Sequence, residues 1–212
     1  MKKGFPELIK TVKSLKKGPV GKQVDLRMSE FREMKCACRN DLFCELAFCI
    51  LTANCSAEAC IRVQDEVGDG FTALTEKQLA SRLKKLGYRF PNKRAAYIVS
   101  AREKKEELKK LIDSGKTGRE IRGWLVDNIT GLGMKEASHF LRNIGFGDVA
   151  IIDFHIIDLL AGYGIISAPE SLTKKKYLKI EEKLAKLADE TRLDLGKLDL
   201  YLWYLETGKI LK

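Results

Sequence analysis

Apolar side chains recur at intervals of three and four residues along most of this 212-residue chain. This spacing places them on one face of an amphipathic helix. Gly87, Gly145 and Gly208 directly follow periodic segments, where a left-handed residue ends a helix at little cost. Only residues 148–153, DVAIID, have an extended pattern, and one such run cannot make a sheet. We therefore expect an all-α protein with helices over 5–15, 41–53, 56–67, 75–87, 93–112, 118–129 and 135–145.

Residues 130–133, TGLG, separate two of these predicted helices and indicate a helix-hairpin-helix. Gly131 and Gly133 permit positive φ and a close approach of the backbone, while Leu132 can anchor the turn in the core. Because glycine has no side chain, the amides of the turn can face a DNA phosphate, and the dipole of the second helix favours the same anion. Ala137 allows the two helices to pack closely. The pattern predicts a hairpin that binds the DNA backbone.

The charge balance also favours a polyanionic partner, since the net charge is +10 and the isoelectric point is near 9.3. Residues 82–94, RLKKLGYRFPNKR, contain no acidic residue and place aromatic side chains among basic ones, which suits phosphates and stacked bases. The alternative is a solvated helix end and a charge excess that only favours solubility. The apolar run 42–53 is too short to span a bilayer, and the first ten residues lack a signal peptide's apolar stretch. We expect an intracellular protein that does not bind membranes.

All six cysteines lie between positions 36 and 60, which raises the question of a metal or iron–sulfur site. No two of them are separated by two residues, the spacing that such sites usually require. Four of them, Cys44, Cys49, Cys55 and Cys60, fall in or beside apolar helical runs, where cysteine behaves as a small hydrophobic residue. We expect reduced thiols in the core, without a disulfide framework.

Lys135 and Asp153 form a candidate catalytic pair, eighteen positions apart. Lys135 falls in the first turn of the second hairpin helix, where the helix dipole disfavours the protonated amine, and only the neutral amine is a nucleophile. The competing interpretation is a lysine on the surface or in contact with phosphate. Asp153 could be only a helix N-cap, although a capping aspartate is also held in a fixed direction. His155 could donate to a phosphate or simply form a hydrogen bond in its helix.

Gly131, Gly133, Lys135 and Asp153 together resemble the signature of the helix-hairpin-helix DNA glycosylase superfamily. A lysine at this position is similar to the bifunctional members, which excise a base and also cleave the strand. The resemblance implies a two-lobed helical fold with the active site in the cleft between the lobes. It also implies that Lys135 attacks the anomeric carbon of a flipped nucleotide, while Asp153 stabilises the developing positive charge and assists deprotonation. The resulting Schiff base would permit β-elimination.

Two stretches near the middle of the chain extend the resemblance. Residues 50–57, ILTANCSA, are similar to the superfamily segment whose Asn or Gln fills the gap left by the flipped base, here Asn54; the alternative is a helix C-cap. Residues 86–101 are similar to the 8-oxoguanine glycosylases, and the resemblance places Tyr88, Arg89 and Phe90 in a loop beside the lesion.

The C-terminal region is similar to the compact 8-oxoguanine glycosylases, in which an aromatic residue and a lysine nine positions later help to form the base pocket. Here these are Trp203 and Lys212. Trp203 and Phe90 would sandwich the oxidised purine, while Lys212 at the chain end would contact its polar edge. The alternative for a helical tryptophan is a place in the core.

Two features that this chain lacks indicate which branch of the superfamily it resembles. Endonuclease III-like members usually carry a C-terminal four-cysteine iron–sulfur loop, whereas this chain has no cysteine after Cys60, and it is too short for an additional β domain. It is most similar to the compact second type of 8-oxoguanine DNA glycosylase/AP lyase of archaea and some bacteria. This implies removal of 8-oxoguanine from duplex DNA with associated AP lyase activity. The alternatives are a bifunctional glycosylase for another oxidised base and a non-catalytic hairpin protein.

The expected architecture follows from this resemblance. Residues 36–148 would form the lobe that carries the hairpin, and residues 1–35 with 149–212 would form the second lobe. The carbonyls of Ile129 and Leu132 would hold a structural monovalent cation, and no cofactor is expected for the chemistry. We expect a monomer that binds duplex DNA containing oxidised guanine and is associated with the nucleoid.

Overall fold

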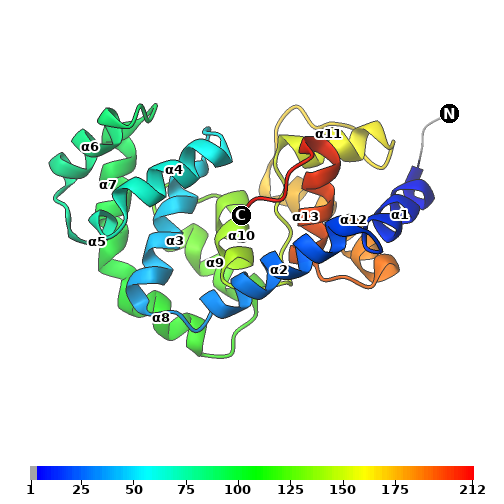
Figure 1. Ribbon diagram of the computed structural model, residues 1–212, viewed down its shortest axis with the longest axis horizontal. Helices are drawn as coiled ribbons and strands as arrows, with labels where there is room; N and C mark the ends of the chain where they lie inside the picture. Colours follow the sequence, from blue (N-terminus) through cyan, green and yellow to red (C-terminus); the bar gives the residue numbers. More distant parts are fainter. Residues whose placement is uncertain (1–3) are drawn as a thin grey trace.

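The computed structural model describes residues 4–212, so residues 1–3 of the expected second lobe lie outside the described part. Helices are the only regular secondary structure within residues 4–212, which confirms the all-α class (Figure 1). Residues 148–153 form neither helix nor strand and link α10 to α11. The elements are α1 (Gly4–Leu15), α2 (Pro19–Met34), α3 (Arg39–Thr52), α4 (Ala57–Val67), α5 (Gly70–Ala73), α6 (Glu76–Lys85), α7 (Pro91–Ala101), the 3-10 helix η1 (Arg102–Lys104), α8 (Lys105–Asp113), α9 (Gly118–Asn128), α10 (Met134–Asn143), α11 (Phe154–Gly162), α12 (Lys174–Thr191) and α13 (Leu195–Thr207).

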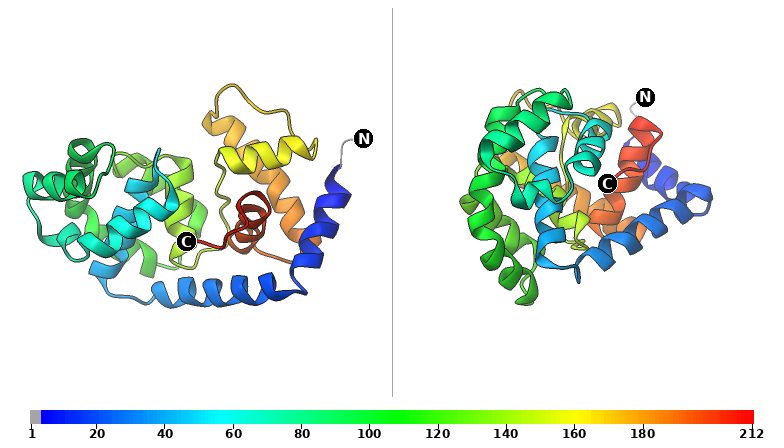
Figure 2. Two further views of the ribbon diagram at one scale, coloured as in Figure 1. Left: turned by 45° about the horizontal axis from the view of Figure 1, so that its top comes forward. Right: turned by 60° about the vertical axis from the view of Figure 1, so that its left-hand side comes forward.

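The buried apolar side chains form two clusters, in agreement with the expected two-lobed fold. The hairpin cluster is built mainly from α3 to α10 and extends in sequence from Leu42 to Val149. The terminal cluster joins side chains between Leu8 and Phe31 to others between Ala150 and Leu202, so that α1 and α2 pack with α11, α12 and α13. The long helix α2 extends from one group of helices to the other (Figure 2).

The expected helix over 93–112 is interrupted. It consists of α7, η1 and α8, and the Arg102 side chain anchors the interruption by donating to the Phe71 carbonyl at 2.8 Å. Leu108 and Ile112 of α8 belong to the hairpin cluster. The apolar pattern had also not singled out α2, α12 and α13, whose buried faces lie in the terminal cluster.

Buried polar contacts join α9 of the hairpin cluster to α12 of the terminal cluster. The Arg122 guanidinium donates to both Glu181 carboxylate oxygens, at 2.5 and 2.8 Å, and both side chains are 4% exposed. The Ala150 amide donates to Glu181 Oε1 at 2.8 Å. The Tyr177 hydroxyl donates to the Ala150 carbonyl at 2.7 Å and accepts from the Ile152 amide at 3.2 Å. These contacts fix residues 150–152 directly before α11.

All six cysteine thiols are free. Cys49 and Cys60 are buried, as expected for core thiols, whereas Cys36 and Cys38 are exposed because they lie in the turn between α2 and α3. Within residues 4–212, no group of His, Cys, Asp and Glu side chains is arranged to hold a metal ion. None of the described helices combines the length and apolar character needed to cross a membrane.

Candidate active site

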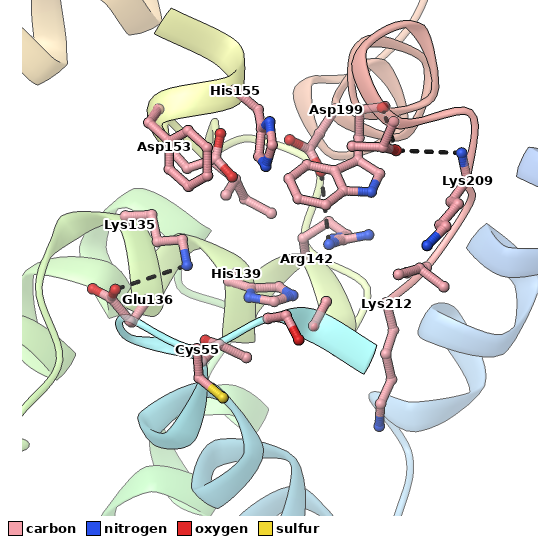
Figure 3. A pocket seen from close by; sticks show the side chains of 18 of the residues that line it. Cys55, Lys135, Glu136, His139, Arg142, Asp153, His155, Asp199, Lys209 and Lys212 are labelled. Atoms are coloured by element: carbon pink, nitrogen blue, oxygen red, sulfur yellow. Dashed lines mark hydrogen bonds and ion pairs between the residues drawn. The ribbon is translucent and has the colours of Figure 1, made fainter. Parts of the chain in front are cut away.

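A cleft of about 710 Å³ lies between the two clusters (Figure 3). Its walls come from the turn after α3, from the buried face of α10, from the start of α11, from α13 and from the residues that follow α13. The polar and aromatic side chains that line it include Asn54, Cys55, Lys135, Glu136, His139, Arg142, Asp153, Phe154, His155, Asp199, Trp203, Lys209 and Lys212.

The hairpin turn between α9 and α10 directly precedes the helix that carries Lys135. Gly131 has a φ of +91°, and a Cβ atom there would lie 2.4 Å from Cδ2 of Tyr97, so both backbone and space require glycine. Gly133 has a φ of −97° and is the N-cap of α10; its amide donates to the Glu136 carboxylate at 3.3 Å. Of the two glycines, which both permit positive φ, only Gly131 adopts it.

The carbonyl of Ile129 accepts from the Leu132 amide at 3.2 Å, which closes the hairpin turn. A carbonyl oxygen has a second lone pair, so this turn is compatible with the monovalent cation expected at Ile129 and Leu132.

Lys135 projects from the first turn of α10 into the cleft (Figure 3). Its side chain is 24% exposed, and its Nζ lies 3.8 Å from Glu136 Oε1. An ion pair of this length at a partly exposed position holds the amine weakly. The amine can therefore move to a substrate in the cleft.

Asp153 is the N-cap of α11, and its Oδ1 accepts from the Ile156 amide at 3.0 Å. The cap fixes the direction of the carboxylate, which enters the same cleft as Lys135 (Figure 3). Tyr177 reinforces this placement, since its hydroxyl holds the preceding residues 150–152. Capping and a role in the cleft are thus compatible for Asp153.

Three buried polar side chains, His139, Arg142 and Asp199, also line the cleft. Nη2 of Arg142 lies 3.6 Å from Oδ2 of Asp199. The pKa of Asp199 is raised to about 7, chiefly by burial and in smaller part by the nearby Asp153, while the charges of Arg142 and Lys135 oppose the shift. Burial lowers the pKa of His139 well below its usual value, and Arg142 and Lys135 add to this effect, so the imidazole is neutral at pH 7.

These buried groups retain unused hydrogen-bonding capacity. Both ring nitrogens of His139, and Nε and Nη1 of Arg142, have no hydrogen-bond partner among the described residues. Buried polar atoms without partners are rare in folded proteins, because they lose their hydrogen bonds to water and form no others in exchange. Since both side chains line the cleft, a ligand there could satisfy them.

An aromatic group forms another wall of the cleft. The His155 ring meets the Trp203 ring edge-to-face, with centroids 4.7 Å apart and an interplanar angle of 82°. The rings of Phe154 and His155 have centroids 3.9 Å apart at a tilt of 36°, and Phe154 is 67% exposed. His155, expected to donate to a phosphate, is thus in contact with two aromatic rings.

Asn54 lies in the turn between α3 and α4 and lines the cleft as an exposed residue. Its φ of +63° is left-handed, a conformation that asparagine tolerates better than most residues. Arg94 of α7 donates to the carbonyl of Ala53 at 2.9 Å and thereby fixes the start of this turn. The C-cap of α3 is Ala53, so Asn54 follows the cap rather than forming it, and it lines the cleft.

Tyr88 and Phe90 are not among the residues that line this cleft. Tyr88 lies in the loop before α7, as expected, but its side chain is buried in the hairpin cluster, and its hydroxyl donates to the Leu51 carbonyl at 2.6 Å. Phe90 precedes α7, is 36% exposed, and has the Arg89 guanidinium 4.9 Å from its ring centroid. The structure thus does not bring Phe90 and Trp203 together in one pocket.

Lys212 lines the cleft, but its ammonium is engaged elsewhere, at 2.9 Å from Glu45 Oε2. Figure 3 shows its side chain directed away from Lys135 and Asp153. We expected Lys212 to contact a base, but in this structure its ammonium forms an ion pair with Glu45 instead.

Sequence reasoning missed His139, Arg142 and Asp199, although helical periodicity could have identified them. Positions 135, 139 and 142 lie four and three residues apart on one face of α10. Asp199 precedes Trp203 by four residues on α13 and shares its face in the same way.

Comparison with known proteins gives a consistent result. Residues 24–193 match the family described as 8-oxoguanine DNA glycosylase. A Korarchaeum cryptofilum protein named 8-oxoguanine DNA glycosylase/AP lyase is 49% identical over 210 residues, which cover 99% of this chain and 100% of the relative.

Solved structures agree. The crystal structure of the Methanocaldococcus jannaschii 8-oxoguanine DNA glycosylase is 48% identical, with a TM-score of 0.92 and coverage of 97% of this chain and 96% of that one. The same enzyme in complex with a 15mer DNA containing 8-oxoguanine gives a TM-score of 0.93, over 97% and 99% of the two chains. The Thermotoga maritima 8-oxoguanine DNA glycosylase is 43% identical, with a TM-score of 0.92 over 98% and 100%. On the combined evidence of fold, site and similarity, this chain belongs to the 8-oxoguanine DNA glycosylase family.

Proposed function

We propose that this protein excises 8-oxoguanine from duplex DNA and cleaves the strand at the resulting abasic site. The observation that carries the proposal is the placement of Lys135 and Asp153 in one cleft. Relatives that match almost the whole chain are named 8-oxoguanine DNA glycosylase/AP lyase, and one related structure contains DNA with 8-oxoguanine, which supports this substrate.

The proposed reaction begins when the neutral amine of Lys135 attacks C1′ of a flipped nucleotide. The N-glycosidic bond breaks, and the base leaves with the bonding electrons and takes up a proton. The carboxylate of Asp153, held by the α11 cap, stabilises the positive charge that develops on the sugar and assists proton removal. Opening of the sugar gives a Schiff base on Lys135, and β-elimination then breaks the C3′–O bond.

The cleft also offers groups that suit a purine. Trp203 presents a large aromatic ring, and His139 and Arg142 present donors or acceptors that no described residue satisfies. A flipped base would stack on the indole and form hydrogen bonds with these side chains. Asn54 would fill the space that the base leaves in the duplex.

The hairpin would bind the phosphate backbone beside the lesion. The amides that follow Gly131 lie at the positive end of the α10 dipole, where an anion is stabilised. A monovalent cation at the Ile129 and Leu132 carbonyls would add positive charge at the same place. The net charge of +10 favours association with duplex DNA and with the nucleoid, and we expect the protein to act as a monomer.

A panel of damaged duplexes tests the substrate. Otherwise identical duplexes would contain 8-oxoguanine, guanine, an oxidised pyrimidine or an abasic site, and released base and strand cleavage would be measured separately. We expect release of 8-oxoguanine in strong preference to guanine, and cleavage of abasic DNA. Preferential release of the oxidised pyrimidine would assign the protein to another lesion, and binding without any release or cleavage would indicate a non-catalytic DNA-binding protein.

A further inference from the structure

Glu45 is a carboxylate inside an otherwise apolar stretch of α3. Its side chain is 3% exposed, and its neighbours in the helix, from Leu46 to Leu51, are almost fully buried. Placing a carboxylate in such surroundings costs several kcal/mol unless charged and hydrogen-bonding partners compensate. The residue takes no part in the chemistry proposed above, so its partners indicate why the site contains an acid.

Three side chains pair with the Glu45 oxygens. Asn143 Nδ2 of α10 donates to Oε1 at 2.6 Å, and Gln64 Nε2 of α4 donates to Oε2 at 3.2 Å. Both belong to the helices of the hairpin cluster, so they fix the carboxylate within that lobe. The third partner is Lys212, whose Nζ donates to Oε2 at 2.9 Å from 167 positions away in the chain.

The segment 208–212, here called the tail, connects the two lobes through this contact. It follows α13, which belongs to the terminal cluster, and ends beside α3 (Figure 1). The Lys212 ammonium also lies 4.6 Å from the ring centroid of Phe48, one turn of α3 from Glu45. A second ion pair of the tail joins Lys209 to Glu58 at 2.6 Å, and both of its side chains are exposed.

The tail is also part of the cleft wall. Lys209, Leu211 and Lys212 all line the cleft that contains Lys135 and Trp203. The buried ion pair therefore determines where this wall stands relative to the aromatic wall. The exposed Lys209–Glu58 pair contributes little because solvent screens it.

We propose that Glu45 is a positioning residue for base recognition: by holding the Lys212 ammonium, it fixes the tail as one wall of the base pocket. The inference rests on the proposed function. Lys135 and Asp153 stand outside this contact, so loss of the ion pair should impair excision of the damaged base but spare cleavage of an abasic site. An abasic site has no base to be positioned.

The test compares Glu45→Gln with Glu66→Gln on two duplexes, one with 8-oxoguanine and one with a preformed abasic site; Glu66 is 54% exposed, pairs with Arg82 and is not among the residues that line the cleft. In Glu45→Gln, the glutamine keeps the size of the side chain and can still accept from Asn143. We expect its single-turnover excision rate to fall about tenfold to a hundredfold, because a buried hydrogen bond between charged groups is lost. Its cleavage of abasic DNA should stay within about twofold of wild type. Glu66→Gln should match wild type on both substrates, because solvent screens its exposed pair with Arg82.

Lys212→Met tests the same contact from its other partner, which is itself 23% exposed. This variant should show the same separation of excision from abasic cleavage. Combined with Glu45→Gln, it should lose no more than the stronger single variant, because both changes break one contact.

Equal losses on the two substrates would assign Glu45 to stability alone and overturn the proposal, as would unchanged excision in either Glu45→Gln or Lys212→Met. Wild type is measured first. A wild-type protein that leaves 8-oxoguanine in place would refute the proposed substrate, and the same comparison would then be made with whichever base of the damage panel it releases.

Discussion

Replacing Asp199 by asparagine should change the pH dependence of stability. The carboxyl is buried beside Arg142, and its pKa is raised from 3.8 to about 7 by burial and by Asp153. The folded protein therefore binds this proton more tightly than the unfolded chain does. The stability contributed by Asp199 is fully present below pH 3.8 and is lost as the pH rises through about 7.

The magnitude follows from the two pKa values. At pH 5.5 the carboxyl is protonated in the folded protein and mostly ionised in the unfolded chain, which contributes about 2 kcal/mol to the free energy of unfolding. At pH 8 both states are ionised at this position, and the contribution is close to zero. Relative to Asp199→Asn, wild type should thus lose about 2 kcal/mol of stability between pH 5.5 and 8.

Guanidinium unfolding followed by circular dichroism at both pH values measures this difference. Asp113→Asn is the matched control, since Asp113 is 54% exposed and forms an ion pair with Lys109 of its own helix. The control should show no comparable change. If the difference between wild type and Asp199→Asn is the same at pH 5.5 and 8, Asp199 does not carry a proton in the folded protein near neutrality, and the electrostatic description of the cleft is wrong.

Two substitutions test other parts of the site. Gly131→Ala should destabilise the protein by about 1–3 kcal/mol and weaken binding to undamaged duplex, because φ is +91° and the new Cβ would lie 2.4 Å from Tyr97; Gly133→Ala, in extended backbone, is the control, and equal stability of the two variants would contradict this reasoning. Asp153→Asn should keep the α11 cap and bind duplex, yet excise 8-oxoguanine about a hundredfold more slowly or worse. Turnover at the wild-type rate would reduce Asp153 to a cap.

The helical fold and the hairpin could be predicted because both depend on local sequence. Apolar periodicity identifies a helix wherever one face is buried, and the two glycines of TGLG indicate a turn. The interruption at η1 could not be predicted in this way. It depends on Arg102 reaching the Phe71 carbonyl from 31 positions away, and the pattern on either side of it is equally helical.

The site was predictable only where its residues have a local signature. Lys135 could be identified from its place directly after the hairpin turn. The ion pair of Arg142 with Asp199 could not, because the two residues are 57 positions apart and nothing in the sequence near one of them indicates the other. The contacts of Glu45 could not be predicted either, because its partners Asn143 and Lys212 are 98 and 167 positions away in the sequence. The burial of the Tyr88 side chain could not be predicted, because an aromatic residue in a basic stretch suits either a base or the core, and the outcome depends on the tertiary position of Leu51.

Borohydride trapping tests the central claim most directly. Borohydride reduces a Schiff base to a stable amine, so a lysine nucleophile becomes covalently joined to the DNA. With duplex that contains 8-oxoguanine, wild type should form a trapped protein–DNA adduct, whereas Lys135→Gln should bind the same duplex and form none. An undiminished adduct in Lys135→Gln would contradict the assignment of Lys135 as the nucleophile.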